Sequence, residues 1–175
     1  YLAILYLNSK DYESAMKAIS AAGLDQPTMQ GAYQKVAYFR GVQHFNAIQY
    51  NAARRLFNKS LDYPLNNVYA SLAHYWLAEI AYREDDFNTA LLEIGKFEAI
   101  PGSATLSEYK RSLYNKGYAY FSKEDYRNAA TTFRLFLNSA KLGTKLANDA
   151  ELRLADSYFM TAQYANAITY YTTYL

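Results

Sequence analysis

The feature that most constrains this chain is an internal repeat with a period of 37 to 39 residues, which occurs five times in 175 residues. Each copy begins with a small residue, and these first positions are Ala3, Gly41, Ala78, Gly117 and Ala155. A mostly aromatic residue follows three positions later, an aromatic six after that, Ala three later, a large residue four later and a further packing residue three later. These internal spacings are the same in all five copies, whereas the linking lengths vary, so each copy is predicted to be one structural unit.

The internal spacings predict a helical hairpin. Steps of three and four residues place side chains on one face of a helix, and the gap of six spans a short turn between two helices. The small residue of the first helix and the Ala of the second allow the two axes to approach closely, while aromatic side chains fill the space beside them. Asp11, Asp86 and Asp125 directly precede the second helix, so we expect them to cap its N-terminus and to have no catalytic role.

The stretches between the hairpins contain helix breakers, including all three prolines, Pro27, Pro64 and Pro101. No change in composition marks a domain boundary, so we predict a single array over residues 1–175. Its expected units are residues 1–24, 33–64, 70–101, 109–140 and 147–175. The chain opens on an apolar helical pattern with no capping residue, which indicates a piece of a longer protein. Without polar capping faces, we expect the ends to fray or to self-associate end to end.

Composition excludes several classes of protein. Hydrophobic residues make up 51% of the chain, which excludes disorder, and a net charge of +2 argues against a strongly basic nucleic-acid binder. The chain has no Cys, so it has no disulfide framework and no thiolate site. No apolar run is long enough to span a membrane. His44 and His74 fall on packing positions, and no glycine-rich phosphate loop is present, so we predict no enzyme activity, cofactor or metal.

The repeat pattern, small-x2-Tyr followed by aromatic-x2-Ala-x3-Phe, with a proline near the end of the unit, resembles the tetratricopeptide repeat. Three departures are a period longer than the usual one of about 34 residues, His44 and Ala81 where Tyr is usual, and His74 where Trp is frequent. The resemblance implies an all-α fold, a right-handed superhelical array of antiparallel helical hairpins. It also implies a scaffold whose first helices line a concave side, with no catalytic chemistry.

A second resemblance rests on residues 150–158 and 163–168, which are similar to envelope tetratricopeptide proteins of the outer-membrane assembly lipoprotein and Tol-Pal coordinator types. This similarity slightly favours the bacterial periplasm or cell envelope over the cytoplasm.

A further stripe remains on the first helices after the hairpin contacts are assigned. Val42, Phe45, Phe121 and Phe159 in this stripe either line the concave groove or pack against the next unit. Tyrosines are better candidates for ligand contact because their hydroxyls need water or a partner. The candidate ligand-binding residues, five Tyr with neighbouring Arg, are Tyr38, Tyr75, Tyr82, Arg83, Arg111, Tyr114, Tyr118 and Arg153.

Aromatic and Arg side chains dominate the binding energy of protein interfaces. We therefore predict a non-catalytic protein–protein interaction scaffold that binds a partner's peptide or amphipathic helix in a concave aromatic groove. In the alternative, the same Tyr stripe stacks on a glycan or on single-stranded nucleic acid. Grooves that bind single strands normally run beside a basic track, which a charge of +2 does not supply, so no nucleic acid is expected.

Overall fold

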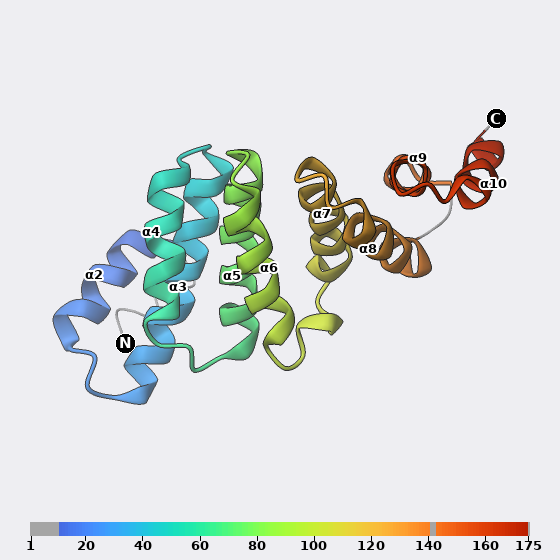
Figure 1. The fold of residues 1–175 in the computed structure, drawn as a ribbon. Coiled ribbons are helices and arrows are strands. Elements are labelled where there is room, and N and C mark those ends of the chain that lie inside the picture. The colour runs from blue at the N-terminus through green and yellow to red at the C-terminus, as the bar shows by residue number, and fades with distance from the viewer. Residues whose placement is uncertain (1–10, 141–142, 175) are drawn as a thin grey trace. The chain divides into compact units, whose positions relative to one another are not determined.

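The computed structural model describes residues 11–140 and 143–174, except for the side chains of Thr173 and Tyr174. Over these residues it is all-helical, which confirms the predicted fold class (Figure 1). The helices are α2 (Tyr12–Ala22), α3 (Pro27–Asn46), α4 (Tyr50–Leu61), α5 (Asn67–Arg83), α6 (Phe87–Ala99), the 3-10 turn η1 (Ser103–Thr105), α7 (Glu108–Ser122), α8 (Tyr126–Ser139), α9 (Lys145–Met160) and α10 (Tyr164–Tyr174). The helix expected over the first ten residues lies outside the described part.

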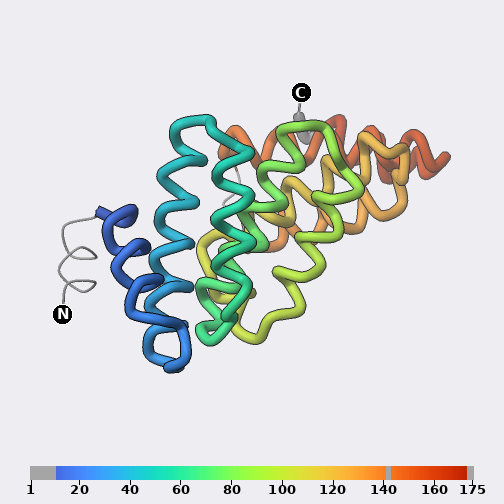
Figure 2. The backbone as a smooth tube through the Cα atoms, turned by 90° about the vertical axis from the view of Figure 1, so that its left-hand side faces the viewer, coloured from blue at the N-terminus to red at the C-terminus, as the bar shows by residue number. Residues whose placement is uncertain are grey.

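The helices pair in chain order as antiparallel hairpins. Helix α3 packs against α4, α7 against α8 and α9 against α10, and Figure 2 shows α3 and α4 running side by side in opposite directions. Contacts also join α2 to α3 and α8 to α9. The described residues form two compact units: unit 1 contains residues 11–80 and 95–104, and unit 2 contains residues 81–94, 105–140 and 143–174.

The repeat positions form the core of the hairpins. The Ala of the second helix is at most 2% exposed in all five copies, at Ala15, Ala53, Ala90, Ala129 and Ala167. In the two copies whose first helix carries glycine as the small residue, this glycine lies close to a ring of the second helix. A Cβ added to Gly41 or Gly117 would lie 2.7 Å from the ring of Phe57 or Phe133, respectively. Small residues are therefore required where the two helices of a hairpin come closest.

Each described turn inside a hairpin uses one residue in the left-handed conformation. These residues are Ile48, Asp85, Glu124 and Ala162, with φ between 58° and 60°. The residue that follows donates its backbone N–H to the carbonyl five residues earlier, as Gln49 does to His44 and Asp125 to Tyr120, each at 2.9 Å. Such hydrogen bonds close the end of the first helix. Glycine is the usual residue in this conformation, so the sequence predicts the short turn but not which of its residues is left-handed.

The capping acids occupy their predicted places. Carboxylate oxygens of Asp11, Asp86 and Asp125 accept the backbone N–H three residues later, at 3.1, 3.1 and 3.3 Å. The Ser14 backbone N–H lowers the pKa of Asp11 because it stabilises the ionised carboxylate.

The structure differs from the sequence prediction at Pro27, which was assigned to a connecting stretch but is the first residue of α3. Proline is tolerated there because the first helical N–H has no partner within the helix.

Candidate protein-binding surface

Two helices of unit 2 bring most of the predicted arginines and tyrosines of that unit together. On α7, the spacing of Arg111, Tyr114 and Tyr118 places them on one face, and on α9 the same reasoning groups Arg153 with neighbouring acids. Helices α7 and α9 are the first helices of consecutive hairpins, and they contact each other directly. We call this region the α7–α9 surface; its residues are Arg111, Tyr114, Tyr118, Phe121, Asp149, Arg153, Asp156 and Tyr171.

Asp149 is the centre of the α7–α9 surface. Its Oδ2 atom accepts hydrogen bonds from the hydroxyls of Tyr114, at 2.8 Å, and Tyr118. The Tyr118 oxygen in turn accepts a hydrogen bond from Arg153 Nε at 3.2 Å. A carboxylate that accepts hydrogen bonds from two hydroxyls fixes both tyrosine side chains, because hydrogen bonds to a charged acceptor are stronger than those to a neutral one. The network therefore holds α7 against α9 and orients the two rings.

Arg153 extends this network to α10. Its Nη1 atom lies 2.7 Å from Asp156 Oδ2, and the other oxygen of Asp156 accepts the Tyr171 hydroxyl at 2.8 Å. The Arg153 guanidinium also lies over the Phe121 ring, 5.6 Å from its centroid. The Arg153 side chain remains 32% exposed, so it is held in place without being removed from solvent. A guanidinium that is already oriented loses little entropy when it binds a further group.

The network raises the pKa values of its tyrosines. Burial raises the pKa of Tyr114 above its ordinary value near 10, and the hydrogen bond to Asp149 raises it further. Burial and the Asp149 hydrogen bond likewise raise the pKa of Tyr118. Burial, followed by the hydrogen bond to Asp156, raises the pKa of Tyr171 to about 12. All three hydroxyls are therefore neutral donors near pH 7.

The aromatic rings of the α7–α9 surface are covered on several sides. The rings of Tyr114 and Tyr118 lie 5.0 Å apart, and both contact Phe133 of α8. The Arg111 guanidinium lies 6.0 Å from the Tyr114 ring centroid, and Arg111 itself is exposed. The surface thus offers solvent two arginines and the uncovered parts of two half-buried tyrosine rings.

The predicted tyrosines of unit 1 occupy different surroundings. Tyr38 and Tyr75 are each only 7% exposed. The Tyr38 oxygen accepts a hydrogen bond from Trp76 Nε1 at 3.2 Å, and the Tyr75 ring contacts Trp76 and Phe97. Both are core residues, and we leave them out of the proposed surface.

The remaining predicted residues lie at the end of α5. Tyr82 is half-buried with its ring against Phe87, and Arg83 is exposed at the last position of the helix.

The apolar members of the stripe divide between the two alternatives. Phe45 is 8% exposed, and its ring lies 4.6 Å from Trp76 of α5, so it packs against the next first helix. Val42 is half-buried against the same core cluster. Phe121 is half-buried beneath Arg153, whereas Phe159 is 54% exposed beside Tyr164.

Sequence analysis missed Asp149 and Tyr171 as members of the surface. Asp149 lies four residues before Arg153 and seven before Asp156, so the three share one helical face, and that spacing was the available signal. Tyr171 could not be separated from a core residue, because it occupies the repeat position that Phe57 and Phe133 fill with fully buried rings.

The described residues contain no group of three or more His, Asp or Glu side chains placed to bind a metal ion. The half-buried His44 shares a hydrogen bond between its Nδ1 atom and Gln49 Oε1. Helices long and apolar enough to cross a membrane are likewise absent from the described part of the chain.

Two segments of the chain match a repeat family of known proteins. One model of the tetratricopeptide repeat matches residues 110–141, and a second model of the same repeat matches residues 149–175. These matches confirm the predicted repeat type over the segments that contain α7 to α10. No curated protein matches the chain.

Solved structures with a similar fold cover nearly the whole chain. A crystal structure of MamA protein superposes with a TM-score of 0.64 at 17% identity, covering 99% of this chain and 86% of that one. A second MamA structure gives 0.63 at 17% identity, covering 98% and 91%. BtubC (BKLC) from P. vanneervenii gives 0.60 at 16% identity, covering 97% and 74%. At these identities the similarity establishes the fold alone.

Proposed function

We propose that the chain is a non-catalytic scaffold that binds a peptide or amphipathic helix of a partner protein on the α7–α9 surface. The tetratricopeptide repeats found over residues 110–141 and 149–175 support a role in protein interaction. The observation that carries the choice of site is the hydrogen-bonded network around Asp149, which holds Tyr and Arg side chains in fixed positions at a first-helix face.

Fixed aromatic and Arg side chains favour binding because little conformational entropy is lost when a partner contacts them. Arg111 is exposed and Arg153 is 32% exposed, so both can bind carboxylates or backbone carbonyls of a partner. The same features argue against the glycan or nucleic-acid alternative. Stacking needs open ring faces, whereas the Tyr114 ring contacts Arg111, Tyr118 and Phe133.

The test begins with capture of partners from the native organism with the full-length protein, followed by titration of the captured protein. We expect Arg111→Glu to weaken binding at least about tenfold, equivalent to about 1.4 kcal/mol, because the reversed charge opposes a partner chosen for a cation. The matched control is Arg134→Glu, which reverses an exposed Arg on α8. Equal affinities for the wild type and Arg111→Glu would contradict the proposal.

A further inference from the structure

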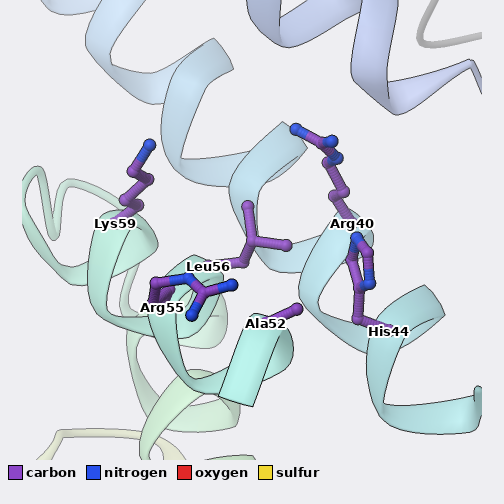
Figure 3. A pocket seen from close by; sticks show the side chains of 6 residues that line it. All are labelled: Arg40, His44, Ala52, Arg55, Leu56 and Lys59. Atoms are coloured by element: carbon purple, nitrogen blue, oxygen red, sulfur yellow. The ribbon is translucent and has the colours of Figure 1, made fainter. Parts of the chain in front are cut away.

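A second surface, in unit 1 and separate from the α7–α9 surface, gathers cationic side chains around a pocket. The pocket has a volume of about 240 Å3 and lies between α3 and α4 (Figure 3). Its lining residues are Arg40, His44, Ala52, Arg55, Leu56 and Lys59, and we call it the basic pocket. Leu56 and Ala52 lie between the charged side chains in Figure 3 and provide an apolar floor.

Helix geometry explains why these basic side chains line one pocket. Arg40 and His44 are four residues apart on α3, and Arg55 and Lys59 are four residues apart on α4, so each pair lies on one helical face. The helices pack as an antiparallel hairpin, and both faces border the same hollow. Leu56 is buried in the core cluster that also contains Met16 and Val36, so the floor of the pocket is fixed by the core.

The charges around the basic pocket are only partly neutralised. Arg40 Nη2 lies 3.4 Å from Glu13 Oε2, but Glu13 also binds Lys17 at 3.0 Å and is 56% exposed. Among the described residues, no acidic side chain forms an ion pair with Arg55 or Lys59. An anion bound in the pocket would be attracted by all three cations that line it.

A neighbouring pocket extends the site. It has a volume of about 340 Å3 and is lined by Met16, Lys17, Ser20 and Tyr33 together with Arg40 and Lys59. Because Arg40 and Lys59 line both pockets, they stand at the boundary between two hollows. A ligand that occupies both pockets must therefore run past Arg40 and Lys59. A suitable ligand is a chain that has an anionic group at these two residues and a side group in each pocket.

We propose that the basic pocket and its neighbour bind an acidic segment of a partner protein, with a carboxylate between Arg40 and Lys59 and an apolar side chain over Leu56. The volumes of the two pockets, about 240 and about 340 Å3, lie near the lower limit of about 300 Å3 for small-molecule sites. Pockets of this size suit single side chains. The apolar floor beside the cations favours a peptide, in which an apolar side chain can neighbour a carboxylate.

The test uses the whole chain and a fluorescent peptide of about ten residues in which Glu alternates with Leu. We expect a Kd of about 100 μM or tighter, a loss of at least about tenfold when Gln replaces Glu, and weakening by added salt. The double variant Arg55→Gln/Lys59→Gln should also lose at least about tenfold. Its control, Lys35→Gln/Arg134→Gln, removes one Lys and one Arg from exposed positions elsewhere and should change the affinity less than about twofold.

Three results would overturn this proposal. The first is that the Glu peptide does not bind at about 1 mM. The second is that the double variant and its control lose affinity equally. The third is that single-stranded DNA or anionic vesicles bind as tightly as the peptide. A thermal melt checks that each variant is folded, and both substituted residues are exposed, so the fold is expected to persist. Since Arg111 and the α7–α9 surface are untouched, failure here leaves the proposed function standing and is distinguishable from its failure.

Discussion

Asp149 shows how one side chain can organise a surface at the residue scale. It accepts hydrogen bonds from the hydroxyls of Tyr114 and Tyr118 on α7, and through Tyr118 it is linked to Arg153. The tyrosine rings pack against α8, so the carboxylate joins the polar face of α9 to an aromatic cluster. Loss of this single group would leave two half-buried hydroxyls without their acceptor.

We predict that Asp149→Ala lowers the free energy of unfolding by about 2 kcal/mol, because Tyr114 and Tyr118 lose a charged acceptor. Glu151→Ala, on the same helix, should change it by less than about 0.5 kcal/mol. Urea unfolding of the two variants measures the difference. Equal, small effects would show that the network does not stabilise the unit.

Alkaline pH should weaken the same network. The folded-state pKa of Tyr171 is raised to about 12 from an ordinary 10, so its contribution is complete below pH 10 and is lost as pH rises through 12. Tyr114 and Tyr118 are shifted in the same direction. Melting temperatures between about pH 9 and 12 should therefore fall less steeply for Tyr171→Phe than for the wild type. Parallel curves would contradict this pKa assignment.

Gly117 sets the distance between α7 and α8. Gly117→Ala places a methyl group 2.7 Å from Cε1 of the fully buried Phe133, so we expect a loss of about 1 to 3 kcal/mol in unfolding free energy. Gly95→Ala is the matched control, since its added methyl meets nothing within 4 Å and helix propensity should raise stability by up to about 1 kcal/mol. Effects of the same sign in the two variants would be inconsistent with the close approach.

At the scale of the element, the helical hairpin is the part of the structure that sequence predicts best. Fixed spacings identified the buried Ala of the second helix in all five copies and the capping acid in three of them, because burial and capping each act at a fixed repeat position. The turn was not predicted in detail, because its left-handed residues are Ile48, Asp85, Glu124 and Ala162 in place of glycine.

The turn residue Ile48 carries a testable cost. It is β-branched, 73% exposed and held at φ 59°, a conformation that costs an L-residue roughly 1 to 2 kcal/mol. We expect Ile48→Gly to be more stable than Ile48→Ala by about 1 kcal/mol, since both lose the same exposed side chain but only Gly adopts this φ without strain. Chemical denaturation of the pair checks the order, and a more stable Ala variant would refute the turn conformation.

The site was harder to predict than the hairpin, and three tyrosines show why. Tyr38, Tyr75 and Tyr114 each lie three residues before the small residue of their unit, so the repeat pattern treats them alike. Yet Tyr38 and Tyr75 are 7% exposed, whereas Tyr114 is half-buried and bound to Asp149. For Tyr38 and Tyr114, the difference lies in what the following first helix presents, Trp76 in one case and Asp149 in the other.

At the scale of the whole molecule, each compact unit carries a surface of its own chemistry. Unit 2 presents ordered tyrosines and arginines around Asp149, and unit 1 presents a basic pocket with an apolar floor. Repeat arrays suit this use because each hairpin contributes its own exposed face while its core follows one pattern. The location in the envelope and the end-to-end self-association stay predictions.

The most direct measurement of the central claim, that the α7–α9 surface binds a protein, is photo-crosslinking in the native organism. A photoreactive amino acid replaces exposed Arg111 in one version of the full-length protein and exposed Arg134 of α8 in another. We predict that the position 111 version yields a discrete protein adduct that is absent from the position 134 version. Equal adducts at both positions, or adducts at position 111 to glycan or nucleic acid only, would contradict the account.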